Sequence, residues 1–439
     1  MSKVRWPRWL LIAGLVLLLL VAGGGLALQR WISTDEFRLR VEREATAALG
    51  VPLRLERVGL TLLPLPAVVL EGVQVRTRQP LKAERIELRP AWGSLLLGRV
   101  GLSTLVVRQA MLSQQGIDAL LLSLQRVRQR EQAQPDDEGL LLLPRRTVLD
   151  ELSWIDSKGQ AIVITAEARL DSLALPEQLD LRIVQGRLQG TQLALRRDTG
   201  LSWILLLRVA GGTVQGRIAL QPAAQPGGEF VLSGQLQTRE VEVSQLTAPA
   251  PTETARAAQL LSGRLEASTT LSARTRQPSA LVDMLQTESK FTVRQGMLHG
   301  IDLIKAVQTA GVSRGGKTPL DTLSGQVRTR GKAVELQNLA ASSGALSATG
   351  QVSISPTQEL AGRVTVELGG AVGVPLAVGG TLEQPEVNLT TGARIGAALG
   401  TLLMPGVGTG AGASVGGKLG EFFSKPPARE AKPEAPQSP

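Results

Sequence analysis

The chain contains no cysteine and no tyrosine, and its only histidine is His299. Without cysteine, disulfide bonds and thiolate metal sites are excluded. A lone histidine close to glycines is typical of a strand end at the surface, so we expect no histidine-based catalytic or metal site. Aromatic residues make up 3% of the 439 residues. Because nucleic-acid binders stack bases on aromatic rings or cluster their basic residues, this composition argues against a nucleic-acid partner.

The charged residues are spread along the chain and are not gathered into a site. The formal net charge is +10, carried mostly by arginines at alternate positions of expected strands. A solvated sheet face explains this pattern, and attraction to an anionic lipid surface is the alternative. The acidic run at 136–138 lies in a polar loop without further ligands nearby. The sequence therefore predicts no metal and no cofactor, and we expect a protein that is not an enzyme.

Residues 10–28 carry no charge. At about 1.5 Å per residue, a helix over this run would be roughly 28 Å long, close to the thickness of a bilayer core. Basic residues precede the run, so the N-terminus is expected in the cytoplasm and the bulk of the chain outside. A cleaved signal peptide is the alternative, but the run is long and no Ala-x-Ala site follows. The expected membrane anchor includes Trp9, Leu10, Leu11, Ile12, Leu15, Leu19, Leu28 and Trp31.

Beyond the anchor, the pattern predicts a mainly β protein. We expect the N-terminal transmembrane helix to be followed by a long, curved, mostly antiparallel β-sheet or groove with a few short helices. A helix is predicted over 35–49, ended by Gly50, and a second one over 113–130. Six segments are expected: the cytoplasmic N-terminus and anchor (1–34), an N-terminal β unit with short helices (35–130), a central β meander (131–247), a C-terminal β unit (248–390), a glycine-rich segment (391–424) and a disordered tail (425–439).

The stretch 360–368 shows the strand alternation most clearly. Arg363, Thr365 and Glu367 share one side. The opposite side is apolar, and its residues are our candidates for the lining of a hydrophobic groove: Leu360, Val364, Val366 and Leu368.

A short signature of glycine, a polar residue and an aliphatic residue recurs without a fixed period. It has arginine after Gly186, Gly216, Gly263 and Gly362, and glutamine after Gly234, Gly325 and Gly350. We expect each of these glycines to form a turn or bulge that opens a strand.

Two glycine-containing stretches invite functional interpretations. Residues 311–318 match the P-loop pattern, but a helical segment precedes them and Pro319 follows directly, so a flexible loop is favoured. In the segment 392–420, glycines recur every four residues. A mobile linker or packed helix pair and association with a membrane both remain open for this segment.

Several pieces of the chain, in order, resemble the AsmA family. In the N-terminal half these are the apolar run, the helix ending at Gly50 and the strands that begin at Pro52 and Leu70. In the C-terminal half they are Leu261-Ser-Gly-Arg-Leu, an expected helix over 281–285, the stretch 293–303 and the stretch 374–387.

This resemblance implies a single-pass inner-membrane protein of Gram-negative bacteria with its bulk in the periplasm. It implies a curved groove related to bridge-like lipid-transfer proteins, and a role in phospholipid transfer or outer-membrane assembly. The implied partners are membrane phospholipids, the inner membrane and other envelope or outer-membrane assembly proteins. Two alternatives remain: a periplasmic structural scaffold with a packed interior and no lipid path, and an envelope enzyme, for which no convergent polar site is seen.

Overall fold

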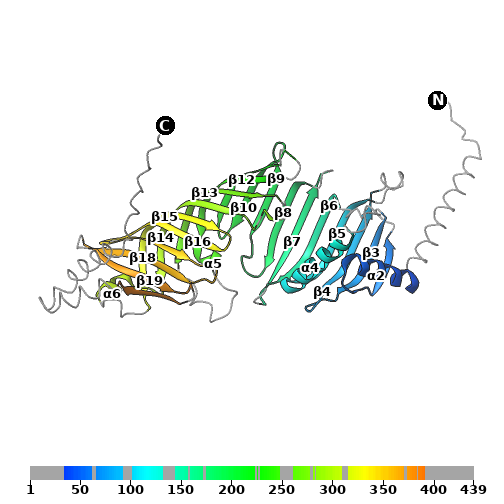
Figure 1. The fold of residues 1–439 in the computed structure, drawn as a ribbon, viewed down its shortest axis with the longest axis horizontal. Coiled ribbons are helices and arrows are strands. Elements are labelled where there is room, and N and C mark those ends of the chain that lie inside the picture. The colour runs from blue at the N-terminus through cyan, green and yellow to red at the C-terminus, as the bar shows by residue number, and fades with distance from the viewer. Residues whose placement is uncertain are drawn as a thin grey trace, which may run out of the picture. The chain divides into compact units, whose positions relative to one another are not determined.

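The computed structural model describes most of the chain between residues 34 and 390 (Figure 1). The described ranges are 34–61, 66–91, 101–131, 144–156, 159–171, 175–222, 225, 228–247, 261–276, 280–281, 283–308, 315–369, 373–382 and 384–390. The expected anchor from Trp9 to Trp31, the glycine-rich segment 391–424 and the tail 425–439 lie outside these ranges. No helix within the described ranges is long and apolar enough to cross a membrane.

The protein is mainly β and divides into two compact units. The N-terminal unit comprises residues 1–200 and 205–207, and the C-terminal unit comprises the rest. The division falls inside one strand and within the expected segment 131–247. The N-terminal unit contains α2 (Asp35–Leu49), β1 (Leu53–Arg54), β2 (Arg57–Thr61), β3 (Ala67–Val75), β4 (Leu81–Pro90), β5 (Leu102–Ser113), α4 (Gln114–Glu131), β6 (Arg146–Ile155), β7 (Ala161–Leu170), β8 (Pro176–Gln185) and β9 (Gln192–Arg197).

Strand β10 (Ser202–Val209) has residues in both units, and the other C-terminal elements follow it along the chain. They are β11 (Gly212–Gln221), β12 (Phe230–Glu242), α5 (Val243–Thr247), β13 (Leu261–Thr275), β14 (Gln286–His299), α6 (Leu303–Gln308), β15 (Lys317–Arg330), β16 (Ala333–Ser343), β17 (Leu346–Ile354), β18 (Leu360–Leu368), β19 (Val374–Gly380) and β20 (Pro385–Leu389). The expected helix over 281–285 is wrong: turns occupy 281 and 283–284, and Gln286 already begins β14.

The pairing is mostly antiparallel between strands adjacent in sequence. In the C-terminal unit, every pairing from β11–β12 to β19–β20 is antiparallel. In the N-terminal unit, β5 and β6 pair in parallel. The chain between them contains α4, which supplies the crossover that two consecutive parallel strands require.

Helix α2 shows how the local sequence fixes an element. Its N-cap Thr34 accepts a hydrogen bond from the amide of Phe37, and Asp35 lies in the positively polarised first turn. Gly50 ends the helix in a left-handed conformation, with φ of 67°. The inward side chains Phe37 and Val41 pack against a buried cluster of the N-terminal unit that contains Leu55, Val58, Val73, Ala83, Ala110 and Leu152. The helix therefore covers the apolar side of this sheet.

Candidate functional site

The strand register shows which side chains of the C-terminal unit share a face, because directly paired residues point to the same side of a sheet. Across β17 and β18, Val366 pairs with Ala348 and Val364 with Gly350. On the other side, Glu367 pairs with Ser347. The candidate lining residues Leu360, Val364, Val366 and Leu368 thus lie on one face, as the alternation predicts.

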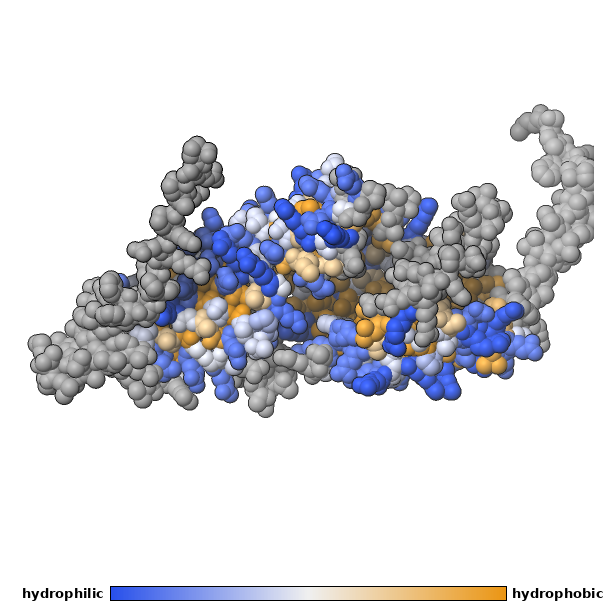
Figure 2. All heavy atoms as spheres, viewed as in Figure 1, coloured by the Kyte–Doolittle hydropathy of each residue, from blue (hydrophilic) through white to orange (hydrophobic). Residues whose placement is uncertain are grey.

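This side continues through the whole C-terminal unit as one uncharged surface, which we call the apolar face. One row of paired residues runs along it from β11 to β20: Gly216, Leu236, Thr269, Ser289, Val327, Leu336, Val352, Gly362, Val378 and Val387. An adjacent row on the opposite side contains Gln237, Ser268, Lys290 and Gln326. The sheet therefore has one apolar and one polar side. Figure 2 shows both kinds of residue over the strands of this unit.

One end of the apolar face is closed by α6. Leu303, from the first turn of this helix, forms a cluster with Leu346, Ala348, Val366, Val374, Leu376 and Leu389. Val366 is 1% exposed, and Val364 and Leu368 pack against the same cluster. A ligand therefore has no access to Val366 while α6 is in place, whereas Leu360 lies outside the cluster and is half-buried.

The middle of the apolar face is more accessible. Leu236, Val327 and Leu336, from β12, β15 and β16, are all half-buried, although they share the face with the closed end. Among the described elements of this unit the helices are α5 and α6, and α6 lies mainly against β15 and β18. The central strands thus present apolar side chains that the described helices leave partly open to solvent.

The glycine signature has a different structural meaning from the one expected. Gly186 is in a turn and Gly263 is at a bulge in β13, as predicted. Gly325 also lies at a register shift, between β15 and β16. However, Gly216, Gly234, Gly350 and Gly362 lie inside strands, so the expectation of a turn or strand-opening bulge is wrong for them.

Their common role is close approach of neighbouring strands on the apolar face. A Cβ atom on Gly350 would lie 2.8 Å from the Cα of Val364 and closer still to the carbonyl oxygen of Arg363. A Cβ on Gly362 would meet the backbone of β17 in the same way. Since only glycine fits at such a contact, these positions allow neighbouring strands to lie close together.

The N-terminal unit also has an apolar side, formed by residues such as Leu70, Ile86, Val107 and Leu149. Its opposite side carries ion pairs between neighbouring strands. Hydrogen bonds from Arg146 and Arg169 hold the pKa of Glu167 below its ordinary value, although partial burial opposes this. Arg196 lowers the pKa of Asp180 through two hydrogen bonds of 2.7 and 2.9 Å. These carboxylates are paired on a charged outer surface.

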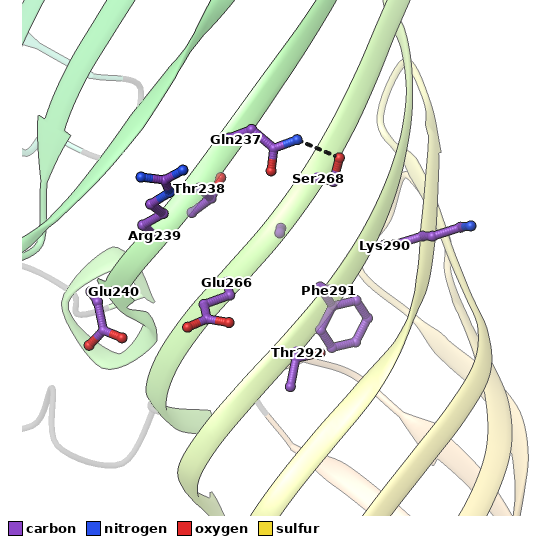
Figure 3. A pocket seen from close by; sticks show the side chains of 10 residues that line it. Gln237, Thr238, Arg239, Glu240, Glu266, Ser268, Lys290, Phe291 and Thr292 are labelled. Carbon is purple, nitrogen blue, oxygen red and sulfur yellow. Dashed lines mark hydrogen bonds between the residues drawn. The ribbon is translucent and has the colours of Figure 1, made fainter.

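A shallow hollow of about 490 Å³ lies at β12, β13 and β14, and its lining includes residues of both sides of these strands (Figure 3). Gln237 donates a 2.9 Å hydrogen bond to Ser268 at its rim. Glu266 is paired with Arg294, and Glu240 with Arg264. The hollow thus contains carboxylates that are already neutralised. Its lining residues are Gln237, Thr238, Arg239, Glu240, Glu266, Ala267, Ser268, Lys290, Phe291 and Thr292.

The P-loop match does not have P-loop geometry. Lys317 begins β15, whereas a P-loop lysine opens a helix. The hydroxyl of Thr318, which would have to bind magnesium, is 2.9 Å from the carbonyl oxygen of Ile301 and 3.0 Å from the amide of Leu303.

The histidine lies at the end of β14, where the ring nitrogen of His299 is 3.3 Å from the hydroxyl of Ser262. Within the described ranges, no group of acidic or histidine side chains could hold a metal ion.

Comparison with known proteins gives no relative: no family model matches the chain, and neither a curated protein nor a solved structure shows significant similarity to it.

Proposed function

We propose that this protein is a non-enzymatic envelope protein of the AsmA type that binds phospholipid acyl chains on its apolar face. The observation that carries the proposal is the row from Gly216 to Val387, which crosses the C-terminal unit without a charged residue and has an accessible middle. Burial of apolar surface stabilises by about 25 cal/mol per Å². An acyl chain laid along this row would therefore be held by the hydrophobic effect.

The proposed setting is the bacterial inner membrane. Residues 10–28 would anchor the chain by a single pass, with the N-terminus in the cytoplasm and the sheets in the periplasm. In that position the sheets would lie beside a source of phospholipid. The proposed activity is lipid handling or transfer, or support of outer-membrane assembly, together with other envelope proteins.

A periplasmic scaffold without a lipid path is the second candidate, and one observation favours it. At the end covered by α6 the apolar face is packed shut, with Leu376 fully buried. If the middle were packed in the same way, no ligand could bind. The half-buried side chains of Leu236, Val327 and Leu336 favour lipid binding instead.

The direct test is identification of lipid on the full-length protein. We expect mass spectrometry of the protein extracted from membranes and freed of loosely bound lipid to detect phospholipid in a reproducible molar ratio. Absence of bound phospholipid under conditions in which the protein stays folded would support the scaffold.

A further inference from the structure

The apolar face is not uniform, because hydroxyl groups gather in its centre. Within the described part of the face between β11 and β19, the paired strand interiors carry aliphatic residues, glycine, alanine or Phe291 at most positions. Five hydroxyl-bearing positions are grouped on β12 to β15, namely Thr238, Thr269, Thr287, Ser289 and Thr329, while Thr275, Thr318 and Ser343 carry further hydroxyls close to the ends of their strands. We call the five grouped residues the hydroxyl band.

Aliphatic residues border the band on both sides. In one row, Leu236 pairs with Thr269, and Ser289 pairs with Val327. In the next row, Leu271 pairs with Thr287, and Thr329 pairs with Val334. The band is therefore flanked by aliphatic residues on the neighbouring strands, and its Thr287–Thr329 pair lies next to Gln286 and Arg330, the last paired residues of β14 and β15.

Two cross-strand hydrogen bonds organise the band. The hydroxyls of Thr269 and Ser289 lie 2.8 Å apart, and those of Thr287 and Thr329 lie 2.7 Å apart. Each hydroxyl has one proton to donate, and a bonded pair uses only one of its two protons. Each pair therefore retains one O–H donor, which has no partner among the described residues.

The two pairs are close enough to serve one ligand. Thr287 and Ser289 are two residues apart on β14 and point to the same side, so they are separated by about 7 Å along the strand. All members of both pairs are half-buried, so a molecule lying on the face can reach them. The face thus offers two adjacent donors in apolar surroundings.

The chemistry of the band restricts the group that it can receive. None of the paired positions in the row from Gly216 to Val387 or in the band carries a formal charge. A phosphate or carboxylate would lose its hydration there without a compensating cation, at a large free-energy cost. A neutral acceptor with apolar chains on either side matches both the donors and their surroundings. In a phospholipid, such acceptors are the ester carbonyl oxygens at the base of the acyl chains.

We propose that the hydroxyl band binds the ester carbonyl groups of a diacyl lipid and so fixes where the lipid lies along the apolar face. The inference rests on the proposed lipid-binding function, which it makes more specific. It implies selection for ester-linked lipids over ether-linked lipids with the same headgroup and chains, because an alkyl ether lacks the carbonyl oxygen. A net hydrogen bond is worth enough to give about a two- to tenfold preference.

The test is a competition between two lipids on the full-length protein. Equal amounts of diacyl phosphatidylglycerol and dialkyl-ether phosphatidylglycerol, matched in chain length and unsaturation, are offered in mixed vesicles, and the bound ratio is read by mass spectrometry. The wild type should retain the diacyl lipid in about two- to tenfold excess. The double variant Thr287→Val/Thr329→Val removes one of the two hydroxyl pairs, so it should retain less of the diacyl lipid and show a diacyl-to-ether ratio clearly below that of the wild type. Replacing both partners by residues of similar shape leaves no unpaired group, so this variant should fold.

The matched control is the cross-strand threonine pair on the polar side, Thr349 and Thr365. The variant Thr349→Val/Thr365→Val should keep the wild-type preference. If the first double variant does not fold, Thr269→Val/Ser289→Ala removes the other hydroxyl pair and is expected to give the same loss of preference.

The possible failures are distinguishable. Binding of neither lipid by the wild type would overturn the proposed function itself. Binding of both lipids in equal amounts would overturn only the hydroxyl-band inference, as would an unchanged preference in the folded band variants or a lost preference in the control. The infrared ester carbonyl stretch gives a second readout: it should shift to lower frequency for lipid bound to the wild type and should shift less for lipid bound to the band variants.

Discussion

Thr318 fixes Leu303 in place: the buried Thr318 hydroxyl accepts a 3.0 Å hydrogen bond from the Leu303 amide. The same hydroxyl lies 2.9 Å from the carbonyl oxygen of Ile301, to which it donates. These bonds attach the start of α6 to β15, and the Leu303 side chain belongs to the buried cluster that contains Val366. Thr318 is the last residue of the P-loop-like sequence 311–318. In this structure its hydroxyl holds the start of α6, which covers one end of the apolar face.

We predict that Thr318→Val destabilises the protein by about 1–3 kcal/mol, because the Leu303 amide is left without its acceptor in a buried position. Urea unfolding of the variant measures the loss. Thr349→Val is the control, since Thr349 is exposed on the polar side and should tolerate the change. Equal unfolding free energies for the two variants would contradict the role assigned to Thr318.

Leu303→Ala should be more costly. The side chain is 7% exposed within its cluster, and removal of a buried leucine to alanine costs about 2–5 kcal/mol. Ile304→Ala is the matched control because Ile304 is the next residue of α6 and is 40% exposed. Thermal unfolding that ranked the two variants in the opposite order would show that α6 does not close the face as described.

The strand-interior glycines lead to a prediction about stability. Gly350→Ala should destabilise the protein by about 1–3 kcal/mol, because the new Cβ is forced against β18. Gly379→Ala, also inside a strand, meets no atom within 4 Å and should be neutral or stabilising by up to about 1 kcal/mol. Chemical denaturation of both variants checks this. Similar effects at the two positions would mean that the close contact on the apolar face does not limit the side chain.

Acid stability should depend on Glu242. Burial raises its pKa, but hydrogen bonds from the Gly263 amide and from Ser244, together with the charge of Arg264, outweigh this and hold the pKa below its ordinary value of 4.5. Because the folded-state pKa is depressed, the stabilising contribution is present above the ordinary value and is lost as the pH falls through the folded-state value. The unfolding free energy of Glu242→Gln should therefore fall less steeply over this acid range than that of the wild type.

Glu229→Gln is the control for that measurement, since Glu229 is exposed. It should reproduce the wild-type acid profile. A Glu242→Gln profile parallel to that of the wild type would show that the carboxylate does not stabilise the bulge at Gly263.

Lys317→Ala should leave lipid binding unchanged. The lysine begins a β-strand and is exposed, so it has no phosphate-binding environment. ATP hydrolysis by the wild type that disappeared in this variant would be decisive evidence against a non-enzymatic function.

Hydrophobic periodicity was sufficient to predict most elements. The helix over 35–49 and the strand 360–368 have the predicted limits, because each has a clear period and a glycine, proline or polar boundary. Strand β13 and the first half of β14 were harder to predict. In β13, the hydroxyl residues Ser268, Thr269 and Thr270 occupy both sides of the strand, and in β14, Thr287 and Ser289 put hydroxyl groups on the otherwise apolar side, so the apolar alternation fades.

Contacts between distant segments were not predictable from local pattern. The alternation of β18 correctly placed Val366 on the apolar face, but the cluster in which it is buried includes Leu303, which lies far away in the sequence. Likewise, a glycine in a bend and a glycine at a close strand contact have the same local signature. The neighbouring carbonyl of Arg363, which makes Gly350 necessary, comes from another strand.

The most direct test of lipid binding places a charge on each side of one strand. Val327 is half-buried in the middle of the apolar face, and Gln326 is its half-buried neighbour on the polar side. On an accessible face Val327→Asp stays partly hydrated, so the protein should fold, whereas an acyl chain would meet a polar barrier. We therefore predict that Val327→Asp remains folded and loses most of its co-purified phospholipid by mass spectrometry, while Gln326→Asp keeps the wild-type amount. Unfolding of Val327→Asp would indicate a closed scaffold, and a folded Val327→Asp protein with the wild-type amount of lipid would contradict lipid binding at this face.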